Sequence, residues 1–298
     1  MECDAGTDRL VIWRTNSDMR IAVIYICTGN YSVFWEGFYQ SSQQYFYPEI
    51  EKDYYVFTDD DKLIRSGWAT SHIFTYFQRK AGWPYDTLMR FNLFSIIQDR
   101  LKQYDYCYFW NANAMFVRRI DESVIPFPNE ERNVLLWRHT WAYDDEYAQS
   151  FDPEPNPKSE AFYPKGDYCH DYGGGFFGGT SAGFIKMSLT LRDRIARDLS
   201  KGIIALWHDQ SHILKYGTEI IPMEVPKDVV VSEEYCEGRN PYVIFLDKHK
   251  FGGMYKLRGM SKGFILKQKF MDCANRVATI LGVKPLIGKL KKIGLNDK

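Results

Sequence analysis

The fold is decided by residues 104–116, which read YDYCYFWNANAMF. The aromatic run from Tyr106 to Trp110 contains no charge, which is typical of a strand buried on both faces of a parallel sheet. Polar side chains at the end of such a strand lie where α/β sheets bind ligands. We therefore expect Asn111 and Asn113 to border a binding site.

The two asparagines also bear on the kind of site. Many enzymes that transfer a sugar from a nucleotide carry Asp-x-Asp at such a strand end, because two carboxylates hold Mn²⁺ or Mg²⁺ on the diphosphate. The segment Asn111-Ala112-Asn113 offers only neutral side-chain oxygens, which attract a divalent cation much more weakly. If this is a site of that kind, we expect it to work without a metal.

The rest of the chain predicts a mostly parallel α/β sheet, because strand-like and helix-like segments alternate. The expected helices are 32–46, 86–102, 181–199 and one opening near residue 209 and running to 216. The expected strands are 20–27, 53–58, 71–77, 106–110, 134–137, 220–225 and 242–246. Residues 144–165 are rich in Pro, Glu and Ser and predict a long surface loop.

Length and composition narrow the class of protein. A chain of 298 residues can bury a full α/β core. Its 38 basic and 38 acidic residues cancel, and the basic ones cluster in one tail, so we expect no nucleic-acid partner. Six scattered cysteines predict reduced thiols in a cytoplasmic protein. Residues 1–18 are interpreted as an N-terminal extension of a catalytic domain at 19–259.

Residues 260–298 differ in character from that domain. From residue 256 to the end there are eleven Lys or Arg and two Asp, with apolar residues interspersed at near-helical spacing. This is the pattern of a basic amphipathic segment on an anionic membrane surface, which would place the protein at the periphery of the inner membrane. The alternative is a solvated helix packed on the domain.

Two further segments have site-like composition. Residues 171–180 read DYGGGFFGGT, which predicts either a glycine-rich bulge or a backbone that approaches a ligand closely. Residues 207–212 read WHDQSH and open a helix, where a carboxylate and an imidazole could bind an anion or a hydroxyl group. Asp209 could equally be a helix cap, and His208 a packed core residue.

Taken in order, five segments resemble glycosyltransferase family 6, which contains the blood-group A and B transferases, α-1,3-galactosyltransferase and bacterial relatives. They are YICTGNY at 25–31, YYVFTD at 54–59, NAN at 111–113, GGFFGG at 174–179 and WHDQSH at 207–212. The resemblance runs from about residue 20 to about residue 258. It implies a GT-A fold and a retaining transfer of galactose or N-acetylgalactosamine from a UDP-sugar to the 3-OH of a galactoside, in α linkage.

The resemblance also assigns donor-binding roles. Residues matching those that hold uracil are Ile26, Thr28 and Tyr31, and Arg90 matches an arginine near the donor. Asn111, Ala112 and Asn113 stand in place of Asp-x-Asp, as in bacterial members that work without metal. The segment that sets donor choice in the family is matched by three small residues, Gly173, Gly174 and Gly175. They leave room for a 2-acetamido group and therefore favour UDP-GalNAc over UDP-Gal. Cations matching those that close over the diphosphate are Lys248, Lys250 and Arg258.

Acceptor and catalytic roles follow in the same way. His139 and Trp207 match residues that contact the acceptor galactose, and Asp209 matches a carboxylate that binds donor-sugar hydroxyls. Gln210 departs from the family pattern, which has Glu as the candidate nucleophile or stabilising carboxylate. It is either an engineered change or a natural variant with front-face transfer or little activity. On this interpretation Gln210→Glu raises the rate by orders of magnitude.

Two other readings stay open. The chain could be a transferase-like module that binds UDP-sugar or glycan without turnover, as Gln210 suggests. It could instead be a metal-dependent transferase whose acidic site is formed by residues 59–61.

Overall fold

The computed structural model describes residues 18–65, 71–139, 153–164, 171–260 and 263. The chain forms two compact units, Met1–Asp247 and Lys248–Lys298. Nearly all of the proposed extension and tail, and part of the predicted surface loop, lie outside the described residues. The membrane-surface hypothesis for residues 260–298 therefore stays a prediction.

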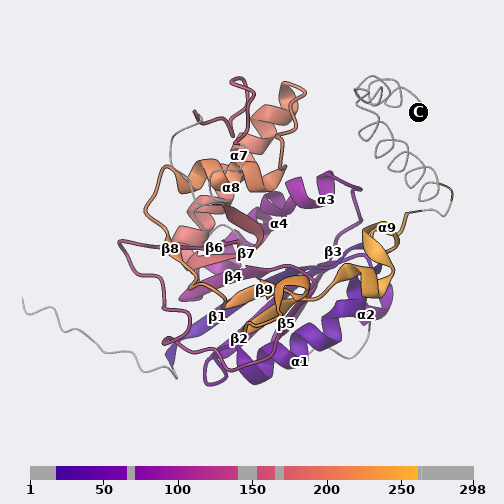
Figure 1. Cartoon of the computed structure of the whole chain (residues 1–298), viewed down its shortest axis with the longest axis vertical. Helices are drawn as coiled ribbons and strands as arrows, with labels where there is room; N and C mark the ends of the chain where they lie inside the picture. Colours follow the sequence, from indigo (N-terminus) through magenta and orange to yellow (C-terminus); the bar gives the residue numbers. More distant parts are fainter. Residues whose placement is uncertain (1–17, 66–70, 140–152, 165–170, 261–262, 264–298) are drawn as a thin grey trace, which may run out of the picture. The chain divides into compact units, whose positions relative to one another are not determined.

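A seven-stranded sheet organises the first unit (Figure 1), in the order β3-β2-β1-β4-β7-β6-β8. Among the described strands of this sheet, only β7 is antiparallel to its neighbours, so the predicted mostly parallel α/β sheet is confirmed. The strands are β1 (Arg20–Ile26), β2 (Glu51–Thr58), β3 (Ile73–Phe77), β4 (Tyr106–Trp110), β6 (Val134–Arg138), β7 (Tyr172–Thr180) and β8 (Met223–Glu224). A second sheet joins β5 (Ala114–Phe116), β10 (Val243–Phe245) and β9 (Val230–Ser232).

Helices cover both faces of the large sheet. On one face, Trp35 and Phe38 of α1 pack against Tyr25 of β1. On the other, Phe94 of α4 and Phe184 of α7 share a buried cluster with Phe177. In the described part of this unit, the helices are η2 (Gly29–Phe34), α1 (Trp35–Tyr45), α2 (Asp61–Arg65), α3 (Tyr85–Leu88), α4 (Arg90–Ile96), α5 (Gln98–Leu101), α7 (Ser181–Ser200), α8 (Asp209–Gly217) and η4 (Glu233–Tyr235). The second unit contains η5 (Lys248–Phe251) and α9 (Gly253–Leu257).

The predicted helix at 86–102 is three short helices, α3, α4 and α5. The backbone leaves the α-helical region at Met89 (φ −84°, ψ 2°) and at Ile97 (φ −101°, ψ 6°). The apolar spacing was continuous because Leu88, Phe91, Phe94 and Leu101 all enter the same core. Periodicity therefore identified the buried face correctly but not the breaks, one of which directly precedes Arg90.

The glycine-rich segment is an inner strand, β7, which pairs regularly with β4 but is irregular where it faces β6, in line with the glycine-rich bulge that the sequence predicts. Its glycines are needed because neighbours come very close: a Cβ on Gly178 would lie 2.2 Å from the Tyr108 ring. A Cβ on Gly179 would lie 2.4 Å from the carbonyl oxygen of Asn133. Between the pairs Leu136–Phe177 and Arg138–Tyr172, β6 advances by two residues and β7 by five, so the extra residues of this irregularity lie in the glycine-rich part of β7.

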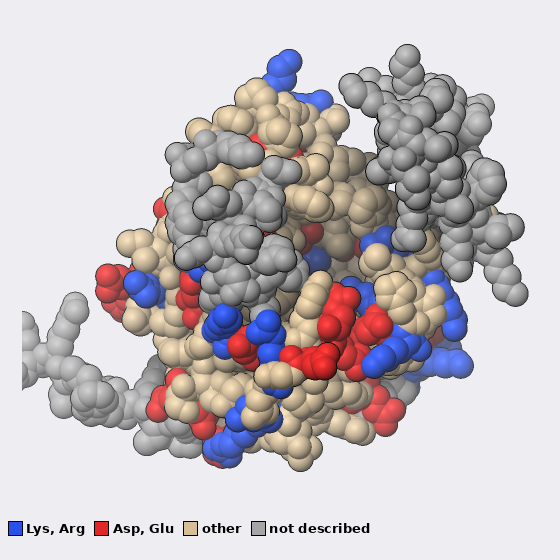
Figure 2. All heavy atoms as spheres, viewed as in Figure 1, with Lys and Arg blue, Asp and Glu red and all other residues tan. Residues whose placement is uncertain are grey.

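Surface properties add two observations. In the face shown in Figure 2, the described residues present both basic and acidic side chains, and neither sign covers the face alone. Among the described residues, no helix has the length and apolar composition required to cross a bilayer.

Candidate active site

The strand directions bring distant segments to one edge of the sheet. β4 ends at Trp110, and the register of antiparallel β7 pairs Trp110 with Phe176. The first residues of β7 therefore lie where β4 ends, and the Asn111 N–H donates to the Gly175 carbonyl at 2.8 Å. β6 runs back beside β7 and places His139, which follows its last residue, at the same edge.

A buried ion pair lies at this edge. Arg90 Nη1 lies 3.2 Å from Asp209 Oδ2 and donates to the Gly174 carbonyl at 2.5 Å. Both charged side chains are 7% exposed, and the guanidinium lies over the Phe109 ring at 4.7 Å. Burial raises the pKa of Asp209, and the Arg90 cation opposes that shift. The pair therefore fixes a carboxylate and a guanidinium at the N-terminus of α8, where sugar hydroxyls could bond to both.

Gln210 belongs to a second polar group beside this pair. Its Nε2 donates to Asp171 Oδ1 at 3.1 Å and lies 3.5 Å from Nε2 of His139. Asp171 is 5% exposed, so its carboxylate is buried at the start of β7. Burial lowers the pKa of His139 to about 4, and the ring is therefore neutral at pH 7. Asp171 was not among the predicted site residues, although it directly precedes the glycine-rich strand.

The three glycines that open β7 lie against this site. Added Cβ atoms would lie 2.5 Å from Trp137 at Gly173, 3.0 Å from Asp209 at Gly174 and 3.0 Å from Phe245 at Gly175. The protein's own packing thus requires glycine at Gly173, and Gly174 allows β7 to approach the buried ion pair. Their expected role in donor choice stays a prediction.

The segment Asn111-Ala112-Asn113 lies at the end of β4 as expected. The Asn113 Nδ2 donates to the Leu246 carbonyl at 2.8 Å, and the Ala112 carbonyl accepts from the Tyr25 hydroxyl at 2.8 Å. Together with the bond from the Asn111 N–H to Gly175, these contacts show that all three residues help to join the end of β4 to neighbouring segments. A divalent cation prefers anionic oxygens, so this neutral segment does not fit an Asp-x-Asp metal site.

The expected uracil-binding residues lie at the end of β1 and just beyond it. Ile26 is the last residue of β1, Thr28 precedes η2, and Tyr31 lies within it. Asp59 braces this loop, because its carboxylate accepts from the backbone N–H groups of Gly29 (2.7 Å) and Lys80 (3.2 Å). The acidic segment 59–61 therefore has a structural role next to the expected nucleotide loop.

The residues of segment 207–212 differ in burial, because Trp207 is exposed and His212 lies in the core. The Trp207 side chain is 46% exposed, as a residue that contacts an acceptor sugar would be. His208 adopts a left-handed backbone conformation (φ 56°), which costs a non-glycine residue free energy and sets the sharp entry into α8. His212 is instead 1% exposed, with its Nε2 3.6 Å from Asp198 Oδ2.

The buried His212 predicts an acid-sensitive fold. Burial lowers its pKa to about 4, whereas an unfolded histidine titrates near ~6.5. The unfolded state therefore binds the proton first, and stability is lost as the pH falls from ~6.5 towards 4. Between pH 7 and pH 5, we expect His212 to lower the free energy of unfolding by about 2 kcal/mol.

Urea unfolding at the two pH values measures this effect. The loss should be smaller by a similar amount in His212→Asn, with the other acid-sensitive groups unchanged. An equal loss in both proteins would contradict the assignment to His212.

Three expected diphosphate-binding cations belong to the second unit. Lys248 and Lys250 lie in η5, and Arg258 follows α9. Their closure over the donor stays a prediction.

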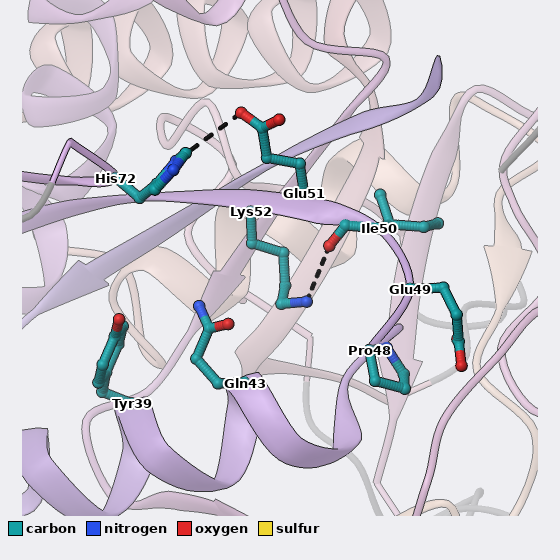
Figure 3. A pocket seen from close by; sticks show the side chains of 8 residues that line it. All are labelled: Tyr39, Gln43, Pro48, Glu49, Ile50, Glu51, Lys52 and His72. Carbon is teal, nitrogen blue, oxygen red and sulfur yellow. Dashed lines mark hydrogen bonds and ion pairs between the residues drawn. The ribbon is translucent and has the colours of Figure 1, made fainter. Parts of the chain in front are cut away.

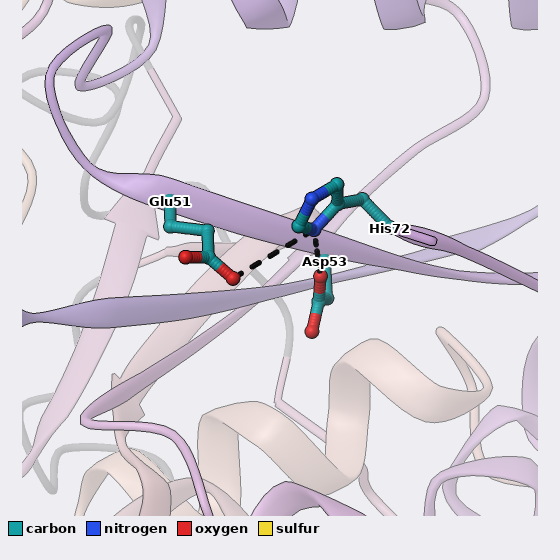
Figure 4. Close-up of side chains that lie close together, drawn as sticks. All are labelled: Glu51, Asp53 and His72. Atoms are coloured by element: carbon teal, nitrogen blue, oxygen red, sulfur yellow. Dashed lines mark hydrogen bonds and ion pairs between the residues drawn. The ribbon is translucent and has the colours of Figure 1, made fainter. Parts of the chain in front are cut away.

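A separate side-chain cluster lies at the opposite edge of the sheet, at the start of β2. Oxygen atoms of Glu51 and Asp53 and Nδ1 of His72 lie within 4.8 Å of one another (Figure 4). Glu51 and His72 also line a pocket of about 450 Å³ beside α1 (Figure 3). Arg20 already approaches both carboxylates, at 2.8 Å from Asp53 and 3.5 Å from Glu51, so the cluster is an ion-pair network rather than a candidate metal centre.

Comparison with known proteins decides the family. The sequence model of glycosyltransferase family 6 matches residues 10–241, which is most of the chain. The chain belongs to glycosyltransferase family 6. The resemblance drawn from the five segments is thereby confirmed.

Relatives within family 6 come from bacteria and animals. The chain is 31% identical over 235 residues to the O-antigen biosynthesis glycosyltransferase WbnI of Escherichia coli, a match that covers 78% of this chain and 96% of that protein. It is 25% identical over 191 residues to the histo-blood group ABO system transferase 1 of Rattus norvegicus, covering 62% and 53%. It is 24% identical over 230 residues to the human globoside alpha-1,3-N-acetylgalactosaminyltransferase 1, covering 75% and 63%. Family membership makes the chain a glycosyltransferase with a nucleotide-sugar donor and a glycan acceptor.

Proposed function

We propose that the protein transfers N-acetylgalactosamine, or alternatively galactose, from a UDP-sugar to the 3-OH of a galactose-terminated glycan, with retention and without a metal. The buried Arg90–Asp209 pair, joined to Gly174 at the edge where β4 ends, carries the proposal. Fixed charged groups at a strand end suit the recognition of sugar hydroxyls beside a nucleotide. His139 and Trp207 would contact the acceptor at the same edge.

The neutral Asn111 and Asn113 support transfer without a metal, because neither supplies an anionic oxygen. In this proposal Lys248, Lys250 and Arg258 stabilise the charge that develops on the departing UDP. They would take the place of a divalent cation.

A second candidate function is binding without turnover. Gln210 favours it, because an amide carries no charge to stabilise an oxocarbenium-like transition state. In that case the site would hold a UDP-sugar or glycan and release no UDP.

A donor panel with EDTA tests these proposals together. UDP-GalNAc, UDP-Gal, UDP-GlcNAc and UDP-Glc are incubated with lactose or a fucosylated galactoside, and UDP release and the glycan product are measured. We expect UDP-GalNAc to be used best and EDTA to change the rate less than twofold. Loss of activity in EDTA that Mn²⁺ restores would contradict metal independence, and binding of UDP-GalNAc without UDP release would favour the binding module.

A further inference from the structure

A loop at residues 201–208 joins α7 to α8 and carries the exposed Trp207. On its C-terminal side, the loop is tied to α8, because the Trp207 N–H donates to the hydroxyl oxygen of Ser211 at 2.9 Å. On its N-terminal side, the Leu206 N–H donates to a carboxyl oxygen of Glu154, which belongs to a distant segment of the chain. The main chain at Trp207 is therefore held from two directions.

The carboxyl group of Glu154 is enclosed by backbone donors. Glu154 is only 4% exposed. Its Oε2 accepts from Leu206, and its Oε1 accepts from the Asn156 N–H at 2.9 Å. Its backbone also forms a parallel bridge with Phe162. Because each carboxyl oxygen has a backbone donor, the side chain can bond to the loop before α8 without leaving a buried polar atom unsatisfied.

The segment that carries Glu154 is attached to α7 by separate contacts. The Ser159 hydroxyl donates to one carboxylate oxygen of Asp198, and the Glu160 N–H donates to the other at 2.8 Å. Ser159 and Asp198 are 7% and 1% exposed. Neither bond involves Leu206 or Trp207, so the segment should stay on α7 when the bond from Glu154 is lost.

Building on the proposed function, we propose that Glu154 is a positioning residue for the acceptor. By fixing the amide of Leu206, it fixes the main chain one residue before Trp207 and thereby orients the indole. An indole offers a rigid apolar face, and its contact with a sugar ring depends on where that face lies. The affinity for the acceptor should therefore depend on Glu154, whereas the affinity for the donor should not.

Steady-state kinetics tests this role. KM is measured for UDP-GalNAc and for the galactoside that wild type uses best, lactose or a fucosylated galactoside. We expect Glu154→Ala to raise the acceptor KM about tenfold, through the loss of a buried hydrogen bond, while the donor KM changes less than twofold. Glu154→Gln keeps one accepting oxygen and should raise the acceptor KM about threefold. It also decides the question if Glu154→Ala does not fold.

A residue needed only for folding would behave differently. It would lower the amount of active protein and leave both KM values unchanged. Ser159→Ala is the matched control, because it weakens the attachment of the same segment to α7 without touching the loop. It should lower the urea midpoint and leave the acceptor KM within about twofold of wild type.

A double variant tests whether Glu154 acts through Trp207. Trp207→Ala removes the indole that Glu154 is proposed to orient. Adding Glu154→Ala to that variant should then change the acceptor KM less than twofold, because the two substitutions affect one contact.

Three results would overturn the role of Glu154. They are an unchanged acceptor KM in both Glu154 variants, an equal rise in Ser159→Ala, and a further tenfold rise when Glu154→Ala is added to Trp207→Ala. Each of them, with a wild type that turns over, leaves the proposed function intact. A wild type that uses no UDP-sugar would instead remove the proposed function, and the same ratios are then measured as dissociation constants for the galactoside with UDP bound. A wild type that also fails to bind the galactoside would remove both proposals.

Discussion

Asp209→Asn is expected to reduce kcat/KM for UDP-sugar by about 1,000-fold and to lower the free energy of unfolding by about 3 kcal/mol. The asparagine has almost the same shape but leaves the Arg90 guanidinium buried without the charge that lies 3.2 Å from it. A buried charge without a counter-charge is strongly destabilising. UDP release and urea unfolding measure the two effects.

The chain offers a matched control. Asp193 forms an ion pair with Arg192 at 2.8 Å, but its side chain is 52% exposed. Asp193→Asn should therefore change stability by less than about 0.5 kcal/mol and leave activity unchanged.

A double variant separates stability from chemistry. Arg90→Met combined with Asp209→Leu removes both charges, so stability should recover while activity stays low. If Asp209→Asn retained a third of the wild-type rate, the ion pair would not be part of the catalytic machinery.

Gly179→Ala is expected to lower the free energy of unfolding by about 3 kcal/mol. The added Cβ would lie 2.4 Å from the Asn133 carbonyl oxygen and 3.3 Å from the Phe184 amide nitrogen, which are both backbone atoms. Neither can move without shifting β6 or α7 against the core. The urea midpoint at pH 7 measures the loss.

Gly37→Ala is the control for this substitution. Its Cβ would meet only the far end of Met115, at 2.9 Å, and that side chain is flexible. Because alanine favours a helix over glycine by ~1 kcal/mol, α1 should be unaffected or slightly stabilised. Equal midpoints for Gly179→Ala and wild type would show that β7 tolerates a side chain there.

Much of the fold could be predicted from the sequence. The strand at 106–110 and the helix opening at Ser181 were found because each has an uninterrupted apolar pattern and clear ends. The edge that carries the site was predicted from the asparagines that follow β4. Short strands such as β9 were missed, because three residues carry too little periodicity.

The contacts within the site could not be predicted from spacing alone. The Arg90–Asp209 pair depends on a helix break at Met89 that the apolar pattern conceals. The position of Asp171 depends on β7 running antiparallel to β4. The local sequence of a strand does not indicate its direction relative to the neighbouring strand, so this position could not be predicted. Family resemblance pointed to Asp209 and Gln210, but it did not predict that Asp171 would face Gln210.

The position of β4 has a consequence for biosynthesis. One side of this strand pairs with β1, which is made earlier, whereas the other side pairs with β7 at residues 172–180. While the ribosome makes the intervening segment, the aromatic strand from Tyr106 to Trp110 has an unpaired backbone edge. Such an edge is a template for association with other chains. The nascent protein thus carries an unpaired strand edge until its glycine-rich strand emerges, and the strand that borders the site is also the one that covers this edge.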